Sequence, residues 1–469
     1  MSQRKAKSTN PHTGEVIAEY DYISDSDLKK VIERSYQAFQ DYRKVDNKTR
    51  AARLEKLSQF LNDNVQKYAE TITKEQGKPI NESLGEVKKA AKHAKYYADN
   101  IDEFLKDEVV ETEYKKSVVE FHPMGPIYHI APFNFPLWLV FKSVIPSITL
   151  GNTIISKTAS ACPQTGMLIE EAFQAAGFVN GEFQFVLTTQ EQSEIIISHP
   201  YVQGVSFTGS TQGGSAIAEL PGKHCKKAIM ELGGSDPFLV FDDADLEVAA
   251  EVATNSRLRN TGQVCTCAKR FIVHEKVYDD FKNRVMKKFS EIKIGDPMNK
   301  DTTMGPLTKK KVLEDIDRQV QEAVKQGGKV LYGGKRATSD ECKKGFYYEP
   351  TIVEVNKGNI LLKEETFGPV MPLVKASDLD EMVKIANDSE YGLGGTIISK
   401  DVEKAQLVGR YIDVGSLFYN TAVTSDSRLP SGGVKNSGFG RECGKYGLRE
   451  FCNIKTVVIK DIPNKQVTD

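Results

Sequence analysis

Most of the chain alternates between short apolar runs and longer segments with helical spacing. From Gly125 onward, runs such as Ile127–Ala131 and Gly204–Phe207 are each followed by a loop and then by a helical pattern. Short apolar runs bounded by turn residues are typical of buried strands, and their alternation with helices predicts a parallel, doubly wound sheet. A second series of the same kind runs from Glu231 to about Gly433. The predicted fold class is therefore α/β.

The two ends of the chain follow other patterns. Before Glu103 the sequence predicts helices over Ser26–Phe39 (with Ser26 as the cap), Lys48–Phe60, Val65–Gln76 and Pro79–Asn100. Val109–Phe121 alternates apolar and polar side chains about a Lys-Lys pair, which predicts a hairpin turning at that pair. Because an isolated two-stranded hairpin is only marginally stable, we expect it to pair with another subunit. The alternating segment Asn453–Lys460 is a natural further strand beside it.

Composition and charge narrow the class of protein. The 469 residues are too many for one core, and 39% hydrophobic with 27% charged residues is typical of a globular enzyme with two or three domains. A net charge of −1 leaves no basic face for nucleic acid, and no long apolar run predicts a membrane span or a signal peptide. The seven cysteines are scattered and odd in number, which indicates free thiols, no metal site and a cytoplasmic location.

One stretch, Thr254–Arg270, concentrates the candidate chemistry. It contains Cys265, with Gly262 three residues before it and a second thiol, Cys267, two residues after it. A helix is predicted before this window and a buried strand, Phe271–Val273, after it. Cys265 should therefore lie in a loop that backbone amides and a substrate can approach. A lone cysteine is more often a buried structural thiol, so the decision depends on the other motifs of the chain.

Further motifs place glycine, amide or carboxylate groups at the ends of predicted elements. They are IAPFNFP at Ile130–Pro136, FTGSTQGG at Phe207–Gly214, MELGGSDP at Met230–Pro237, EETFGP at Glu364–Pro369 and PSGGVKNSGFG at Pro430–Gly440. The glycines of FTGSTQGG open a predicted helix, where backbone N–H groups can approach a pyrophosphate. Singly, each motif also fits a turn, a surface carboxylate, a helix cap or a flexible loop. Since ligands bind at the carboxyl ends of parallel strands, residues 132–134, 157–160 and 208–214 should gather at one crevice.

Together these motifs resemble those of the aldehyde dehydrogenase superfamily over nearly the whole chain. MELGGSDP, NTGQVCTC and EETFGPV, in this order and spacing, carry the resemblance. Within the superfamily the chain is most similar to bacterial succinate-semialdehyde dehydrogenases, through RNTGQVC, GGVKNSGFGRE and KYGLREFCNIKTV. The resemblance implies an aldehyde dehydrogenase-like fold that assembles as a homodimer or homotetramer. Its implied parts are a Rossmann-like cofactor domain (1–102 and 124–230), a catalytic αβ domain (231–435) and a small β oligomerisation element (103–123 and 436–469).

The activity that the resemblance implies is NAD(P)-dependent oxidation of an aldehyde to a carboxylic acid. Cys265 would attack the aldehyde carbonyl, giving a thiohemiacetal whose oxyanion is held by Asn134 and the backbone N–H of Cys265. After hydride transfer to the nicotinamide, Glu231 would activate the water that hydrolyses the thioester. The cofactor-binding residues implied are Phe133, Lys157, Thr158, Ala159, Ser160, Gly209, Ser210, Leu232, Glu365 and Phe367.

The resemblance also bears on the choice of cofactor and substrate. Many NAD-specific relatives carry Glu where this chain has Ser160, and that carboxylate would repel a 2′-phosphate, so NADP is favoured over NAD. Arg259 and Ser425 match groups that contact the carboxylate of succinate semialdehyde in similar enzymes. Lys142 is a further candidate for that carboxylate, although similar enzymes often have Arg there, whose planar fork binds carboxylates in a bidentate manner. Ser431 replaces a common aromatic residue, which changes the shape of its loop.

Alternatives remain for both the reaction and the second thiol. The enzyme could act on another small aldehyde or transfer the acyl group to CoA, although Glu231 speaks against CoA. A non-catalytic relative is a third alternative, against which the intact Cys265, Asn134 and Glu365 argue. Cys265 and Cys267 could form a strained, reversible disulfide, as in some similar enzymes, because Cα atoms two residues apart in a strand lie near the upper limit for a bridge. Cys267 could equally be a small packing residue.

Overall fold

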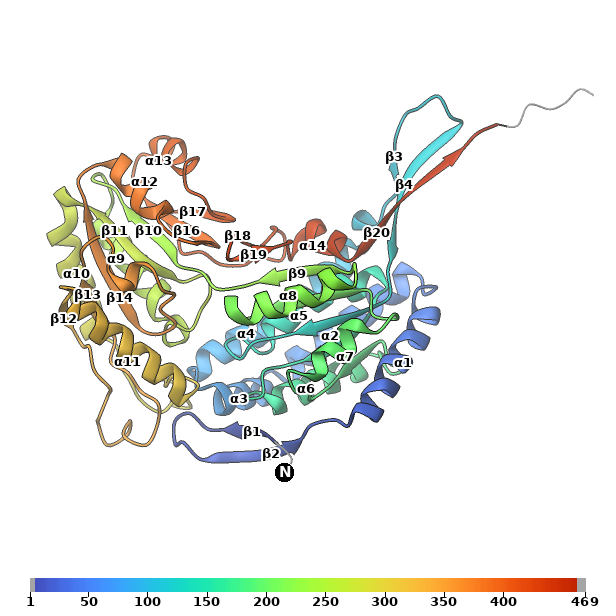
Figure 1. Ribbon diagram of the computed structural model, residues 1–469, viewed down its shortest axis with the longest axis horizontal. Coiled ribbons are helices and arrows are strands. Elements are labelled where there is room, and N and C mark those ends of the chain that lie inside the picture. The colour runs from blue at the N-terminus through green and yellow to red at the C-terminus, as the bar shows by residue number, and fades with distance from the viewer. Residues whose placement is uncertain (1–4, 462–469) are drawn as a thin grey trace, which may run out of the picture.

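The computed structural model describes residues 5–461 and consists of two bodies of sheet and helix side by side, with a small sheet projecting from one of them (Figure 1). Residues 1–4 and 462–469, which include the ends of the predicted cofactor domain and of the predicted tail, lie outside the described part. Each body has a largely parallel sheet with helices against it, so the α/β prediction is confirmed.

The first sheet has the strand order β19–β9–β8–β5–β6–β7, with only β19 antiparallel. Its strands are β5 (Pro126–Ile130), β6 (Thr153–Lys157), β7 (Phe183–Phe185), β8 (Gly204–Thr208), β9 (Lys227–Glu231) and β19 (Gly438–Phe439). Every residue of β5 and β8 is buried, which accounts for their near-continuous apolar pattern. The chain winds outward in both directions from the β5–β8 pair. A ligand crevice is therefore expected above the carboxyl ends of these two strands.

Helices cover this sheet and extend it into an N-terminal helical layer. They are α1 (Asp25–Tyr42), α2 (Asn47–Asp63), α3 (Val65–Gln76), α4 (Ile80–Phe104), α5 (Trp138–Leu150), α6 (Pro163–Ala175), α7 (Gln192–Ser198) and α8 (Thr211–Lys223). The cap of α1 is Ser24 rather than Ser26, because the Ser24 side chain accepts from the Asp27 N–H. All residues of α5 are buried, so any charge on this helix must find its partners inside the protein.

The second sheet has the order β12–β13–β14–β11–β10–β16–β17, parallel except for β12. Its strands are β10 (Asp236–Val240), β11 (Ala268–His274), β12 (Lys329–Tyr332), β13 (Thr351–Glu354), β14 (Val370–Ala376), β16 (Gly394–Ile398) and β17 (Ser416–Tyr419). The helical elements that follow them are α9 (Leu246–Leu258), η1 (Arg259–Gly262), η2 (Glu275–Val277), α10 (Tyr278–Ser290), α11 (Lys310–Lys325), η3 (Ile360–Leu362), α12 (Leu379–Asn387), α13 (Val402–Gly409) and α14 (Gly444–Glu450). The short strands β13 and β17 were missed by the sequence pattern.

The projecting sheet contains β3 (Glu108–Val109), β4 (Lys116–Pro123) and β20 (Cys452–Ile459), in the order β20–β4–β3 (Figure 1). β20 pairs antiparallel along the whole of β4, which confirms the predicted strand beside the hairpin. The predicted turn at the Lys-Lys pair is wrong, because Lys116 is already the first residue of β4. The alternation of this segment fixes a strand but gives no signal for where the chain reverses.

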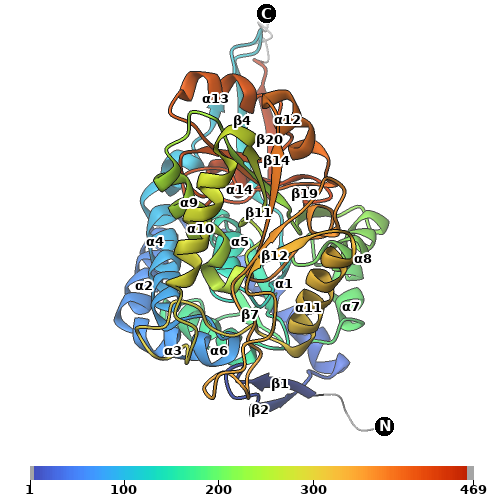
Figure 2. The ribbon, with the colours of Figure 1, turned by 90° about the vertical axis from the view of Figure 1, so that its left-hand side faces the viewer.

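Two smaller pairs complete the described strands. β1 (Lys5–Thr9) pairs with β2 (Val16–Asp21) at the end of the molecule opposite the projecting sheet (Figures 1 and 2). β15 (Tyr391–Gly392) pairs with β18 (Val434–Lys435). Within residues 5–461, no helix has the length and apolar character to span a membrane, and no cluster of His, Cys, Asp or Glu is placed to hold a metal ion.

Candidate active site

The loop that carries Cys265 begins with an unusual backbone turn. After α9, Asn260, Thr261 and Gly262 all take positive φ angles, of 48°, 55° and 74°. A Cβ at Gly262 would lie 2.2 Å from the carbonyl oxygen of Gly368, so only glycine fits there. Cys265 follows as a partly exposed residue after a buried run. The turn therefore leaves Cys265 partly exposed within an otherwise buried loop.

Asn260 ties this turn to the loop of the predicted oxyanion donor. Its Nδ2 donates to the backbone oxygen of Asn134 at 2.8 Å, and its Oδ1 accepts from Nε2 of Gln76 at 2.9 Å. Nδ2 of Asn134 in turn donates to the backbone oxygen of Gln263 at 3.0 Å. A positive φ is unfavourable for a residue with a side chain, and these buried bonds hold the turn in place. As a result Asn134 is fixed beside the Cys265 loop.

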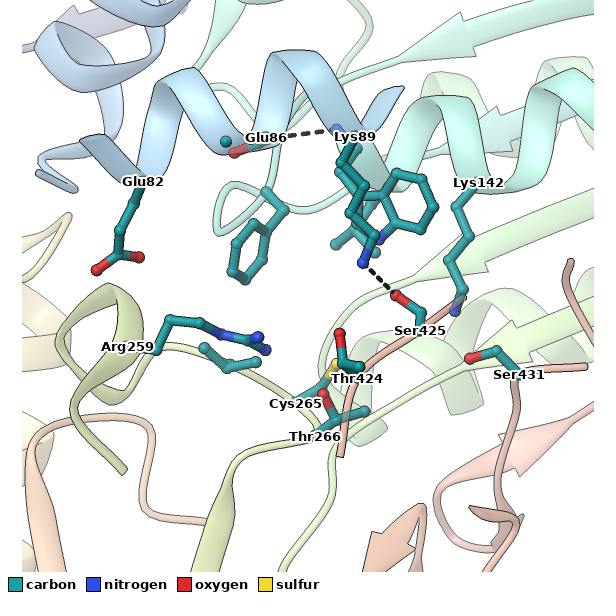
Figure 3. Close-up of a pocket in the computed structure, with 15 residues that line it drawn as sticks. Glu82, Glu86, Lys89, Lys142, Arg259, Cys265, Thr266, Thr424, Ser425 and Ser431 are labelled. Atoms are coloured by element: carbon teal, nitrogen blue, oxygen red, sulfur yellow. Dashed lines mark hydrogen bonds between the residues drawn. The ribbon is translucent and has the colours of Figure 1, made fainter. Parts of the chain in front are cut away.

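Two cavities share Cys265 and Leu139 in their linings, with volumes of about 220 Å³ and 230 Å³. The first, called here the cation-lined cavity, is lined by Glu82, Gly85, Glu86, Lys89, Phe135, Trp138, Leu139, Lys142, Arg259, Val264, Cys265, Thr266, Thr424, Ser425 and Ser431 (Figure 3). The second, called the strand-end cleft, is lined by Pro132, Phe133, Asn134, Leu139, Thr208, Gly209, Ser210, Leu232, Gly233, Cys265, Val312, Glu365 and Phe367. The thiol can therefore meet one molecule from each side.

The cation-lined cavity brings the predicted substrate-binding residues together. Arg259, Lys142 and Ser425 all line it, together with Lys89 from α4. Lys89 and Arg259 extend into the space near Cys265 from two different walls (Figure 3). Nζ of Lys89 donates to Oγ of Ser425 at 2.9 Å. This cavity can hold an aldehyde whose far end is negatively charged.

The strand-end cleft contains most of the predicted cofactor residues and fits a dinucleotide. Ser210 caps α8 and leaves the N-terminus of this helix facing the cleft, as a pyrophosphate site requires. Oε1 of Glu365 accepts from the Gly234 N–H and forms a salt bridge with Nζ of Lys269, each at 3.2 Å. Within residues 5–461 no partner donates to Oε2, which can take a ribose hydroxyl. The hydroxyl of Thr208 is buried in the same lining, with no partner among those residues.

Two aromatic rings line this cleft. Phe133 and Phe367 meet edge to face with ring centroids 6.1 Å apart. Leu232 also lines the cleft, and the Cβ of any side chain at Gly233 would lie 2.5 Å from Oε2 of Glu365. The missing side chain at Gly233 therefore keeps the carboxylate accessible. A planar ring system fits between these groups and Cys265.

Glu231 and Lys142 belong to a buried charge cluster with Glu442. Nζ of Lys142 lies 3.2 Å from Oε2 of Glu231 and 2.7 Å from Oε2 of Glu442, and all three side chains are no more than 5% exposed. Burial raises the pKa of Glu231 to about 7, with Lys142 opposing the shift and Glu442 adding to it. Burial disfavours the Lys142 ammonium, but the two carboxylates raise its pKa well above the ordinary value. Glu231 thus titrates near neutrality, as a general base should.

Glu231 is absent from the linings of both cavities. Its Oε1 is buried and receives no hydrogen bond from the described residues. An unpaired buried carboxylate oxygen is costly, so this atom is a natural acceptor for water. Lys142 lines the cation-lined cavity, but its charge is directed to the two carboxylates.

The surroundings of Cys265 act on the pKa of its thiol in opposite directions. Burial raises its pKa to about 11, while Lys142 and Lys269 act in the opposite direction. Nζ of Lys269 is fully buried and donates to the backbone oxygens of Cys265 at 2.6 Å and Val264 at 2.9 Å. Both Cys265 and Cys267 are free thiols, and Sγ of Cys267 donates to the backbone oxygen of Val264 at 3.0 Å. The proposed disulfide between them stays a prediction.

The predicted adenosine-binding residues after β6 do not line the strand-end cleft. Nζ of Lys157 donates to the backbone oxygen of Thr188 at 2.8 Å, and Thr158 bonds to the backbone within its own loop. Ser160 lines a separate cavity of about 250 Å³ that also contains Lys309 and Lys310, and Ala159 lines neither cavity. Burial lowers the pKa of Lys157 to about 8. Their role in cofactor binding stays a prediction.

Several residues of the site were missed in the sequence, among them Lys89, Asn260, Lys269 and Glu442. Lys89 follows Glu82 and Glu86 by seven and three positions on α4, a helical spacing that could have placed all of them on one face. Asn260 and Lys269 lie inside the Cys265 window, but no pattern distinguishes them from neighbouring polar residues. Their roles depend on contacts with Asn134 and Glu365, which are distant in the sequence.

Comparison with known proteins agrees with this geometry. The model of the aldehyde dehydrogenase family matches residues 1–457. A succinate-semialdehyde dehydrogenase [NADP(+)] of Deinococcus radiodurans is 37% identical over 465 residues, covering 99% of this chain and 96% of that protein. The succinate semialdehyde dehydrogenase [NAD(P)+] Sad of Escherichia coli is 36% identical over 453 residues, covering 96% and 97%. The crystal structure of succinic semialdehyde dehydrogenase from Streptococcus pyogenes with NADP+ superposes with a TM-score of 0.94 at 38% identity, covering 97% of this chain and 100% of that one. From the sequence motifs, the fold and these relatives, we conclude that the chain belongs to the aldehyde dehydrogenase family.

Proposed function

We propose that this aldehyde dehydrogenase oxidises succinate semialdehyde to succinate, with NADP as the hydride acceptor. The observation that carries the proposal is that Cys265 is shared by a cation-lined cavity and by a cleft at the carboxyl ends of parallel strands. The relatives from Deinococcus radiodurans and Streptococcus pyogenes, whose descriptions name this substrate and NADP, support the choice.

Cys265 acts as the nucleophile in the first half of the reaction. Its thiolate attacks the aldehyde carbonyl, and the charges of Lys142 and Lys269 favour that thiolate. One N–H of the Asn134 amide is bonded to Gln263, so the second N–H and the backbone N–H of Cys265 can receive the oxyanion. When bound, the nicotinamide supplies the hydride acceptor, and Cys265 is left as a thioester.

Glu231 acts as the general base in the second half. Its carboxylate removes a proton from the water that hydrolyses the thioester, and a pKa of about 7 suits this task near neutral pH. The buried and unpaired Oε1 is the atom that holds the water. Glu231 is not part of either cavity lining. Its side chain must therefore turn toward Cys265, or act through a water, once the thioester has formed.

The nucleotide lies in the strand-end cleft. Gly209, Ser210 and the N-terminus of α8 hold the pyrophosphate, and Glu365 holds the ribose hydroxyls beside the nicotinamide. Phe133, Leu232 and Phe367 enclose the ring. Lys157, Thr158, Ala159 and Ser160 hold the adenosine end, where the hydroxyl of Ser160 favours a 2′-phosphate.

Arg259 and Ser425 bind the distal carboxylate of the substrate. The Nε of Arg259 is buried and has no hydrogen-bond partner among residues 5–461, which leaves the guanidinium ready for an anion. Lys142 lines the same cavity, but it is paired with Glu231 and Glu442.

The projecting sheet serves assembly in this proposal. β3, β4 and β20 extend away from both bodies and expose Val109, Val458 and Ile459, which are 76%, 46% and 45% exposed (Figure 1). Covering such strands with a second copy gives a homodimer or homotetramer. The seven free cysteines fit a reducing cytoplasm.

A substrate panel tests the proposed reaction. Reduced cofactor is followed by absorbance with succinate semialdehyde, glutarate semialdehyde, butanal, betaine aldehyde and lactaldehyde, each with NADP and with NAD. The expected result is the highest kcat/KM for succinate semialdehyde with NADP, and free succinate formed without CoA. Equal activity on butanal would exclude a carboxylate-specific site, and a requirement for CoA would exclude hydrolysis through Glu231.

A further inference from the structure

The acidic side chains of the cation-lined cavity are already engaged by other groups. Oε1 of Glu86 accepts from the Leu137 and Trp138 N–H groups at 2.9 Å, and its Oε2 accepts from the buried Lys78 at 2.6 Å. Glu82 accepts from the Asn260 N–H at 2.9 and 3.1 Å. These carboxylates anchor α5 and the turn before Cys265. Their hydrogen bonds therefore go to groups other than Lys89 and Arg259, although their charges still act on these two cations.

Two cations of this cavity keep their charge available for a ligand. Within residues 5–461, neither Lys89 nor Arg259 forms a salt bridge, whereas Lys142 is paired with Glu231 and Glu442. Lys89 lies 4.1 Å from the ring centroid of Trp138, and Arg259 lies 5.8 Å from that of Phe135. Aromatic faces orient a cation without consuming its hydrogen-bond donors. Hydrogen-bond donors of Lys89 and Arg259 therefore remain available to a ligand in this cavity.

The bond between Lys89 and Ser425 prepares a site for an anion. Nζ of Lys89 donates one hydrogen to Oγ of Ser425 at 2.9 Å and retains its other donors. Because the Ser425 oxygen accepts from Lys89, its own hydrogen must point elsewhere and can be donated to a ligand. Lys89, Ser425 and Arg259 together offer several donors from three separate segments of the chain, which fits a planar carboxylate.

We propose that Lys89 is a specificity-determining residue that binds the distal carboxylate of the substrate jointly with Arg259, and orients Ser425 to donate to it. This inference rests on the proposed function and refines its substrate class to aldehydes with a terminal carboxylate. It assigns the second cation of the subsite to α4, whereas Lys142 serves Glu231. Arg259 and Ser425 thus keep the roles that the sequence resemblance implied, and Lys89 takes the role that it implied for Lys142.

The proposal has a consequence for the pH dependence of substrate binding. Burial lowers the pKa of Lys89 to about 8, and the like charge of Arg259 adds to this effect. The titratable or charged groups facing Lys89 are Glu86 and His93 on α4, Lys142 on α5, Arg259 of η1 and Cys443 before α14. Since the ammonium is lost as pH rises through this value, KM for a carboxylated aldehyde should increase above about pH 8. KM for a neutral aldehyde should not.

The test compares Lys89→Met with Lys89→Arg and with Lys88→Met, a change at the exposed neighbouring lysine. The measured quantity is the ratio of kcat/KM for succinate semialdehyde to kcat/KM for butanal, with NADP, at pH 7 and pH 9. Lys89→Met should lower this ratio about 10- to 100-fold at pH 7, as expected when one partner of a desolvated charge pair is removed. It should also abolish the fall of the ratio between pH 7 and pH 9. Lys89→Arg should keep most of the ratio at both pH values, and Lys88→Met should match the parent.

The outcomes separate this inference from the proposed function. If the parent does not discriminate between the two aldehydes, the proposed function fails and the inference fails with it. If the parent discriminates and Lys89→Met keeps the parent's ratio and pH profile, only the assignment of Lys89 is overturned. Equal losses on both aldehydes in Lys89→Met and in Lys89→Arg would show that Lys89 supports α4 rather than the substrate.

Discussion

Replacing Lys142 with Met should shift the pH dependence of thioester hydrolysis. In the parent, Glu231 must be ionised to act as a base, so turnover should rise with pH through the pKa of about 7. Lys142 is the cation that favours this ionised form, from 3.2 Å away. Met fills a similar volume without the charge. The ionised form of Glu231 then loses its main stabilising partner, and its pKa must increase.

The size of this shift follows from the geometry. Two unit charges 3.2 Å apart interact by roughly 5 kcal/mol at an effective dielectric constant of about 20, which is equivalent to about 4 pKa units. This is a ceiling, because the surrounding protein and water rearrange around the new side chain and compensate for part of the lost charge. A net increase of about 2 units, half of that ceiling, moves the midpoint to about 9. Near pH 7.5 the ionised fraction of Glu231 then falls from about 0.8 to about 0.03, roughly a 25-fold loss of turnover.

Rapid mixing with NADP and succinate semialdehyde separates the two halves of the reaction. The initial burst of NADPH reports formation of the Cys265 thioester, and the linear phase that follows reports its hydrolysis. Lys142→Met should retain a burst and show a slow linear phase that recovers toward pH 9–10. Lys142→Arg should stay close to the parent. Glu231→Gln should give a burst followed by a stall at every pH, and Cys265→Ala should give neither phase.

Two results would refute this reasoning. A linear phase of Lys142→Met with the parent's pH midpoint would mean that Lys142 does not control the ionisation of Glu231. A large increase in KM for succinate semialdehyde, with the pH midpoint unchanged, would instead support the direct carboxylate contact first expected for Lys142.

Three further predictions concern the two ends of the substrates and the second thiol. Arg259→Ala should lower kcat/KM for succinate semialdehyde about 100-fold or more and change it little for butanal, because a desolvated carboxylate loses its partner; equal losses on both would assign Arg259 to the fold. Ser160→Glu should lower kcat/KM for NADP at least 10-fold and favour NAD, because the new carboxylate repels a 2′-phosphate; an unchanged NADP:NAD ratio would place cofactor choice elsewhere. Mild peroxide should form a disulfide between Cys265 and Cys267, which peptide mass analysis detects, and dithiothreitol should restore the activity. Cys267→Ser should lose its activity irreversibly, and faster than the parent. If peroxide only adds oxygen atoms to the thiols, and Cys267→Ser is no more sensitive to peroxide than the parent, Cys267 is a packing residue.

The sequence by itself determined the fold class and most of the order of elements, and it singled out the loop that contains Cys265. Strands such as β5 and β8 are buried on both faces, so their apolar runs are visible without a structure. The sequence motifs also include Gly262 and Gly233, which occupy places that no side chain can enter. Where the periodicity was weak the prediction was weaker, as for β13, β17 and the turn before β4. Alternation defines a strand but does not define where the chain turns.

Only the tertiary structure decided how the charges are distributed. Nothing in the sequence distinguishes Lys142, Lys89 and Lys269. In the structure Lys142 stabilises Glu231 and Lys89 faces the cation-lined cavity. Lys269 joins the Cys265 loop to Glu365. Which carboxylate meets which cation depends on segments that are far apart in the chain and on the burial that strengthens each pair. The strength of an ion pair depends on the distance between its charges and on the local dielectric constant. Neither quantity produces a repeating pattern in the sequence, as helices and strands do.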